Sequence, residues 1–240
     1  MFRMILNRTA SGITDFILPK VCLCCDTPID GYPANGNKFI CPKCYGKLER
    51  YNDPHPWKDD YISLGVIDNS MSAFWFREGA EIQTLMHEMK YGKMKSVGRL
   101  FGREIGGVII SETNIKWDYV IPVPLHKARQ RDRMYNQSEF IADGINEKIR
   151  AVVLADGIIR TRFTGTQTKL NKQERKENVK NAFEVNPKHK HNIVNKNIIV
   201  VDDVITTGAT ILECAETLKL SGAGIVWVCS AAYAELNIKL

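Results

Sequence analysis

The stretch from Ile198 to Thr210 constrains the fold of this 240-residue chain more than any other part of its sequence. It reads IIVVDDVITTGAT, an apolar β-branched run that leads into two aspartates and then into a turn of small residues. An unbroken apolar run of this kind is typical of a strand buried in a parallel sheet. Asp202 and Asp203 then fall at the carboxyl end of that strand, where open α/β sheets bind their ligands.

The turn after the two aspartates has the composition of a phosphate-binding loop. Its hydroxyl and backbone N–H groups would lie at the start of a helix, where anions bind favourably. The expected phosphate ligands are Thr206, Thr207, Gly208, Ala209 and Thr210. Because carboxylates bind sugar hydroxyls, the pair and the turn together predict a ribose-phosphate site. The simpler alternative is an ordinary strand–helix junction in which an aspartate caps the helix.

The same stretch resembles the signature with which type I phosphoribosyltransferases bind 5-phosphoribosyl-1-pyrophosphate (PRPP). The resemblance implies that Asp202 and Asp203 are the catalytic pair and hold the 2- and 3-hydroxyls of the ribose. It also implies that the turn 206–210 wraps the 5-phosphate, and that Mg²⁺ bridges pyrophosphate and ribose oxygens.

The cysteines of this chain predict a second site. Five of the seven lie near the N-terminus, and four of these form two CxxC pairs separated by fifteen residues, the spacing of a two-knuckle zinc ribbon. Four thiolates complete a closed tetrahedral shell, which is typical of structural rather than catalytic Zn²⁺. The predicted ligands are Cys22, Cys25, Cys41 and Cys44, with Cys24 interpreted as a bystander that could replace a neighbour. The alternatives are disulfides or a redox CxxC pair.

The order of apolar strands and helical patterns predicts an α/β fold with a doubly wound, mostly parallel sheet. We expect two domains: residues 1–56, an N-terminal helix with the four-cysteine zinc module, and residues 57–240, a phosphoribosyltransferase-type domain. Residues 51–57 have the turn-forming composition of a linker. Two β-like runs, 61–67 and 73–76, predict a hairpin.

The net charge of +6 is concentrated in one part of the chain. Residues 126–180 hold thirteen Lys/Arg and seven Asp/Glu, an excess equal to that of the whole protein. A localised basic surface suits a polyanion, either a pyrophosphate-bearing substrate or a nucleic acid. Within it, the basic loop after the strand at 119–123 offers side chains for the pyrophosphate group, although a solvated face is the alternative. These side chains are Lys127, Arg129, Arg131 and Arg133.

The hydrophobic fraction of 44% and charged fraction of 25% are typical of a soluble globular protein. The chain has no run of eighteen apolar residues, so we expect no membrane span. Residues 1–20 have the spacing of an amphipathic helix and no signal-peptide cleavage site. The expected compartment is the cytoplasm.

Further segments extend the resemblance to one family, the ComF (ComFC-like) competence proteins. It covers the chain from Cys22 to about Ala232, with one departure at Met134, where the family usually has glycine. The additional segments are Lys90-Tyr91-Gly92, the Pro-Val-Pro-Leu run at 122–125, Tyr135-Asn136-Gln137 and the loop 167–183. Asn136 is also expected to cap the helix that follows it.

The ComF resemblance implies a PRPP-binding, phosphoribosyltransferase-like protein that acts in natural transformation. Its partners would be imported single-stranded DNA and a helicase-like competence protein. Two alternatives stay open: a phosphoribosyltransferase of nucleotide metabolism that transfers a pentosyl group to a small nitrogenous acceptor, and a non-catalytic PRPP sensor. Fold alone does not choose among them, because function depends on the site.

Overall fold

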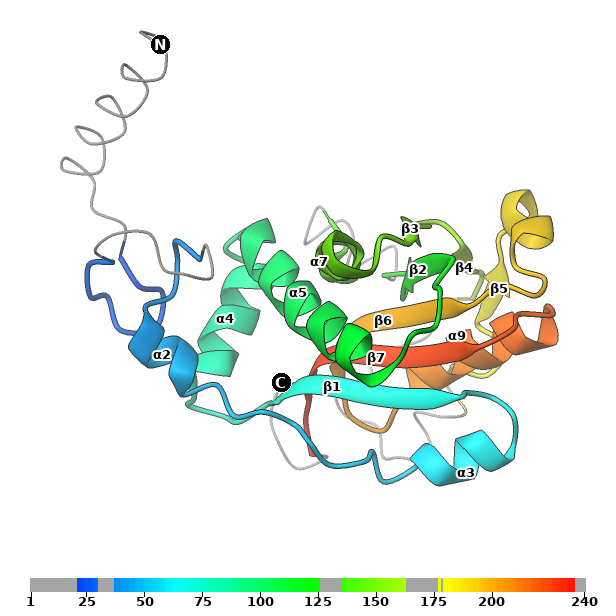
Figure 1. Ribbon diagram of the computed structural model, residues 1–240, viewed down its shortest axis with the longest axis horizontal. Helices are drawn as coiled ribbons and strands as arrows, with labels where there is room; N and C mark the ends of the chain where they lie inside the picture. Colours follow the sequence, from blue (N-terminus) through cyan, green and yellow to red (C-terminus); the bar gives the residue numbers. More distant parts are fainter. Residues whose placement is uncertain (1–20, 30–36, 126–134, 163–176, 178, 236–240) are drawn as a thin grey trace, which may run out of the picture.

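A five-stranded parallel sheet forms the centre of the computed structural model, which describes residues 21–29, 37–125, 135–162, 177 and 179–235. The strand order is β1-β7-β6-β2-β3, and all neighbours run parallel (Figure 1). The strands are β1 (Asn69–Trp75), β2 (Tyr119–Pro122), β3 (Val152–Val153), β6 (Ile198–Ile205) and β7 (Val226–Tyr233). A separate antiparallel pair consists of β4 (Ile158–Arg160) and β5 (Phe183–Val185).

Strand β6 lies in the middle of the sheet, paired with β2 on one side and β7 on the other. Its residues alternate between two cores: Ile199 and Val201 belong to one, Ile198 and Val200 to the other. Burial on both faces explains why this strand is continuously apolar. The strand continues to Ile205, two residues beyond the expected end, so the aspartate pair lies within its last half.

Helices cover both faces of the sheet, which confirms the predicted doubly wound arrangement. Residues of α4 (Glu81–Lys90), α5 (Lys95–Glu112) and α7 (Gln137–Ile149) pack in the first core, and those of α9 (Ala209–Leu220) in the second (Figure 1). In the described part of the chain, no helix is both long and apolar enough to cross a membrane. The remaining short elements are α2 (Pro42–Gly46), α3 (Lys58–Ser63) and η2 (Pro187–Asn192).

The hairpin expected from residues 61–67 and 73–76 is wrong. Residues 58–63 form α3, whose first turn carries Asp59 and Asp60, and the chain then enters β1. Acidic residues favour the start of a helix, and short apolar runs do not distinguish a helix from a strand. Strand β1 pairs with β7, far along the chain, rather than with its sequence neighbour.

Helices α5 and α7 pack backbone against backbone. A Cβ atom added at Gly102 of α5 would lie 2.0 Å from the carbonyl oxygen of Ile141 in α7. A Cβ atom at Gly144 of α7 would lie 2.3 Å from the carbonyl oxygen of Arg99. Only glycine permits so close an approach, and the contact fixes α7 on the sheet beside β2 and β6.

The four-cysteine segment packs on the same side of the molecule as α4 and α5 (Figure 1). Cys22 and Cys44 are buried in the core that these two helices share with the sheet. The ammonium group of Lys47 lies 3.0 Å from the carboxylate of Glu81, at the start of α4. The segment is thus attached to the α/β body, and a domain boundary after residue 56 stays a prediction.

Candidate ribose-phosphate site and metal centre

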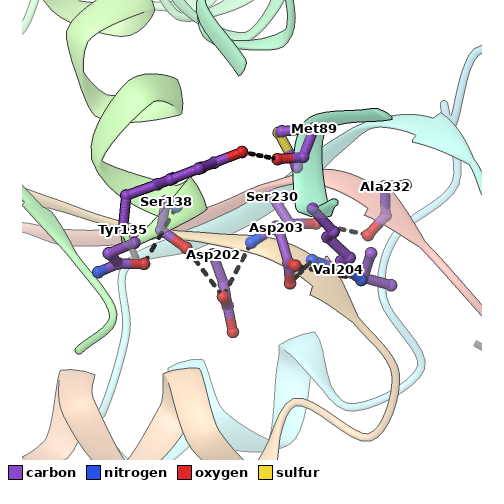
Figure 2. Close-up of polar contacts among 10 residues, drawn as sticks. Met89, Tyr135, Ser138, Asp202, Asp203, Val204, Ser230 and Ala232 are labelled. Atoms are coloured by element: carbon purple, nitrogen blue, oxygen red, sulfur yellow. Dashed lines mark hydrogen bonds and ion pairs between the residues drawn. The ribbon is translucent and has the colours of Figure 1, made fainter. Parts of the chain in front are cut away.

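The two aspartates of β6 contact different helices, and Figure 2 shows the contact of Asp202 with Ser138. Asp202 Oδ1 accepts a hydrogen bond from Ser138 Oγ of α7 at 3.1 Å and from the backbone N–H of Asp203 at 2.8 Å. Asp203 Oδ1 accepts from the N–H of Val204 at 2.7 Å. Asp203 Oδ2 lies 3.2 Å from the Nζ atom of Lys90, which is the last residue of α4. The acid pair therefore lies where β6 meets the ends of two helices.

Burial and the charge of Asp203 raise the proton affinity of Asp202. Loss of hydration on burial, and next the charge of Asp203, raise the pKa of Asp202 to about 7. The hydrogen bonds from the Asp203 N–H and from Ser138, together with the charge of Lys90, act in the opposite direction. Two carboxyl groups that share a small space resist double ionisation. The site therefore favours a ligand that brings positive charge or hydroxyl donors.

The segment Tyr135-Asn136-Gln137, one of those that carry the family resemblance, brings three elements together. The Tyr135 hydroxyl donates to the carbonyl oxygen of Met89 at the end of α4 (Figure 2). Asn136 Nδ2 donates to the carbonyl oxygen of Val123, just after β2, at 3.0 Å. Asn136 Oδ1 accepts from the N–H of Ser138 at 3.2 Å, which confirms the predicted helix cap.

Lys90 and Ser138 are site residues that the sequence did not identify as such. Lys90 stood out only as part of the Lys-Tyr-Gly turn of the family resemblance. Ser138 contacts a residue sixty-four positions away, and no local pattern indicates that contact. The signal in the sequence that could have identified Ser138 as a candidate site residue is its position in the first turn of α7, just after the Asn136 cap.

The predicted phosphate turn joins the end of β6 to α9. Gly208 is the N-cap residue and has φ of 77° and ψ of −7°, in the left-handed region that favours glycine. Without a side chain, Gly208 cannot cap the helix itself. Three residues thus separate the strand that carries the acid pair from the N-terminus of α9, which is the positive end of the helix dipole.

The basic side chains expected to bind pyrophosphate, Lys127, Arg129, Arg131 and Arg133, lie outside the described residues. So does most of the loop 167–183, and so do residues 1–20. Their predicted roles remain predictions.

The four predicted metal ligands meet at one point. The Sγ atoms of Cys22, Cys25, Cys41 and Cys44 all lie within 4.8 Å of one another, and those of Cys25 and Cys41 are 3.8 Å apart. Zinc–sulfur bonds of about 2.3 Å in a tetrahedron place the sulfurs about 3.8 Å apart. The four cysteines are therefore positioned to bind a metal.

Backbone N–H groups support this cluster. The N–H of Cys41 donates to Cys22 Sγ, and the N–H of Cys44 donates to Cys41 Sγ, both at 3.4 Å. Hydrogen bonds of this kind orient metal-binding thiolates. Cys24 contacts the carbonyl oxygen of Glu81 instead, with its Sγ 3.9 Å away, and is not one of the four clustered sulfurs.

The parallel sheet, the acid pair and the turn that follows define a doubly wound α/β protein with four cysteines positioned to bind a metal. Two solved structures are similar to the chain at 20% identity: the allosteric regulatory enzyme of purine biosynthesis and the glutamine PRPP amidotransferase of B. subtilis. Their TM-scores are 0.39 and 0.40. Each match covers 61% of this chain but only 30% of the enzyme.

Sequence relatives then confirm the resemblance to the ComF family. The DNA utilization protein YhgH of Escherichia coli is 27% identical over 205 residues, which is 84% of this chain and 81% of that protein. Competence protein F of Haemophilus influenzae is 34% identical over 115 residues, 48% of this chain and 50% of that protein. No model of a known protein family matches the chain.

Proposed function

We propose that this protein binds PRPP with Mg²⁺ at the carboxyl edge of its sheet and handles DNA during competence. The observation that carries the proposal is the acid pair of β6, followed within a few residues by the glycine turn that opens α9. In the proposal, Asp202 and Asp203 bind the ribose hydroxyls and the turn 206–210 binds the 5-phosphate. Lys127, Arg129 and Arg133 bind the pyrophosphate group.

The electrostatics of the acid pair support this ligand. Burial and the charge of Asp203 raise the pKa of Asp202, so the pair holds its second negative charge weakly near neutral pH. Carboxylate oxygens are ligands that Mg²⁺ prefers, and the metal would neutralise charge on the pair and on the pyrophosphate. Ser138 and Lys90 hold the two carboxylates in place before any ligand binds.

If the protein is an enzyme, its reaction is transfer of the 5-phosphoribosyl group, a pentosyl transfer. The bond from the ribose C1 to the pyrophosphate oxygen would break while a bond to a nitrogen acceptor forms. Positive charge would develop on the sugar ring, so positioning and charge stabilisation would supply most of the rate. In this reaction the carboxylates of Asp202 and Asp203 would orient the ring, and the proton lost by the nitrogen acceptor would pass to a base that the acceptor site supplies.

The relatives support a role with DNA rather than in nucleotide synthesis alone. Their names refer to DNA utilization and to competence. The excess of basic residues within 126–180 suits a polyanion such as imported single-stranded DNA. In this proposal the protein works in the cytoplasm beside a helicase-like partner, and the four cysteines hold a structural Zn²⁺.

Calorimetric titration with PRPP–Mg²⁺ tests the proposed ligand. We expect binding by the wild-type protein and none by the Asp202→Asn/Asp203→Asn variant. Asp143→Asn is a matched control, because among the described residues this aspartate of α7 forms a surface ion pair with Arg99 at 3.4 Å and lies outside the acid pair. Absence of binding in the wild type would refute the PRPP site.

Two further measurements separate the candidate functions. Salt-dependent binding of labelled single-stranded DNA, kept in the double aspartate variant, would support a DNA role at a surface distinct from the acid pair. Release of pyrophosphate in the presence of a panel of nitrogenous acceptors would support the enzyme. Binding of PRPP with neither result would favour the sensor.

A further inference from the structure

The segment 51–57, expected to be a linker, is packed into the protein beside the phosphate turn. The side chains of Tyr51, His55 and Trp57 are 7%, 2% and 5% exposed. The rings of His55 and Trp57 are parallel to within 3°, with centroids 4.7 Å apart. Tyr51 also stacks on His55, with centroids 5.1 Å apart. A three-ring stack of this kind is a rigid structure rather than a connector.

The indole of Trp57 lies directly against the backbone of the phosphate turn. A Cβ atom at Gly208 would lie 2.7 Å from Trp57 Cε2 and 2.9 Å from Trp57 Cζ2. The ring therefore fills the space that a side chain at Gly208 would need. Gly208 also has a positive φ, so both its conformation and its contact with the indole require glycine.

A chain of hydrogen bonds holds His55 in one orientation. The Ser230 hydroxyl donates to the carbonyl oxygen of Ala232 at 2.8 Å, so its single hydrogen is used. Ser72 Oγ, 2.6 Å from Ser230 Oγ, must then donate to it and accept from His55 Nε2 at 2.9 Å. His55 Nδ1 is left to accept from Ser70 Oγ at 2.9 Å.

This assignment needs a neutral imidazole with its proton on Nε2. Burial, and next the charge of Lys58, lower the pKa of His55 to about 4, which agrees with a neutral ring at physiological pH. The serines belong to β1 and β7, in the centre of the fold. The orientation of His55 is therefore fixed by the sheet itself.

We propose that Trp57 is a positioning residue that holds the turn 206–210 ready to bind a phosphate group. The sheet serines orient His55, His55 orients Trp57 by stacking, and Trp57 supports the backbone at Gly208. A turn that is already ordered loses less conformational entropy when its ligand binds. This inference rests on the proposed PRPP site, and it adds a residue outside the phosphoribosyltransferase signature to that site.

Trp117 supplies a matched control. It is also 5% exposed, and it packs on Trp227 at a centroid distance of 5.2 Å near the amino ends of β2 and β7, away from the turn. Neither indole N–H has a hydrogen-bond partner among the described residues. Trp57→Ala and Trp117→Ala therefore remove similar packing and no described hydrogen bond.

Both alanine variants should lower the melting temperature. Only Trp57→Ala should speed amide hydrogen exchange within 206–210 and weaken PRPP–Mg²⁺ binding, by roughly tenfold or about 1.4 kcal/mol. Trp57→Phe, which keeps a flat ring against the turn, should restore most of both properties. If the two alanine variants behave alike in exchange and affinity, the positioning role is refuted and PRPP binding stands.

The exchange measurement needs no ligand. Faster exchange at 206–210 in the Trp57→Ala variant, but not in Trp117→Ala, would support the positioning of the turn even if the wild type bound no PRPP. Absence of PRPP binding by the wild type would then refute the proposed ligand but not the positioning role of Trp57.

Discussion

The proposed metal centre and the proposed ribose-phosphate site differ in how widely their residues are spaced along the chain. All four clustered cysteines lie between residues 22 and 44, and two CxxC turns form the cluster. The acid pair depends on Lys90 of α4 and Ser138 of α7, which are far from it in sequence. Local spacing therefore reveals the first site completely and the second only in part.

The two sites also rest on different sources of stability. The cysteines lie on turns and on a helix of five residues, a segment too short to form a hydrophobic core by itself. The acid pair lies on β6, whose preceding residues are buried on both faces. Loss of a ligand should therefore disrupt the metal centre itself, whereas changes at the acid pair should alter charge and affinity more than the fold.

The largest expected effect is at the metal centre. Cys25 is exposed, so Cys25→Ser removes a predicted ligand without removing core packing. We expect bound metal to fall to background and residues 22–29 and 37–44 to lose protection from hydrogen exchange, since metal binding and folding are coupled in such modules. Metal analysis and hydrogen exchange measure both.

Cys24→Ser is the control for this prediction, because Cys24 lies next to Cys25 but points to the carbonyl oxygen of Glu81. It should keep its metal. Metal retained in Cys25→Ser, or lost in Cys24→Ser, would contradict the four-cysteine assignment.

The next largest effect is expected on stability, at the contact between α5 and α7, the helix that carries Ser138. Gly102→Ala would place a methyl group 2.0 Å from a backbone oxygen of α7, so we expect the free energy of unfolding to fall by roughly 3 kcal/mol or more. Gly107→Ala, on the same helix with nothing within 4 Å, should instead gain up to about 1 kcal/mol. Denaturant titrations compare the two. Similar results for both variants would show that α5 and α7 are not in backbone contact.

A smaller effect is expected at Asp202. An unfolded aspartate has a pKa of about 3.9, whereas burial and the charge of Asp203 raise the folded value to about 7. Between these values the folded state binds more protons, so ionised Asp202 destabilises the protein above pH 7 and stability rises as the pH falls toward 5. Asp202→Asn should melt about 2–4 °C higher than wild type at pH 8, and this difference should shrink by pH 5. A difference that does not change with pH would contradict the raised pKa.

The smallest effect is expected from the substitution Lys90→Gln, on the pKa of Asp202. The positive charge of Lys90 lowers the pKa of Asp202, so Lys90→Gln should raise that pKa further. Carboxyl carbon shifts followed by NMR during a pH titration would measure the change. Lys47→Gln removes a comparable ion pair at the cysteine segment and should leave Asp202 unchanged. A pKa of Asp202 that stays the same or falls in Lys90→Gln would contradict the electrostatic effect of Lys90 on Asp202.

Much of the fold could be predicted because its signals are local. The apolar run of β6, the Asn136 cap of α7 and the CxxC spacing each lie within a few residues. The wrong hairpin at 61–76 shows where this reasoning fails, since β1 pairs with a strand more than 150 residues away. Short apolar runs do not carry information about such partners.

The sequence by itself determined the acid pair, the turn that follows it and the four clustered cysteines, because neighbouring residues specify each of them. Only the tertiary structure decided that Lys90 and Ser138 hold the aspartates, and that the stack at 51–57 supports Gly208. The physical reason is that these contacts form between elements brought together by burial of two cores, one on each face of the sheet. Packing of this kind depends on the whole chain at once.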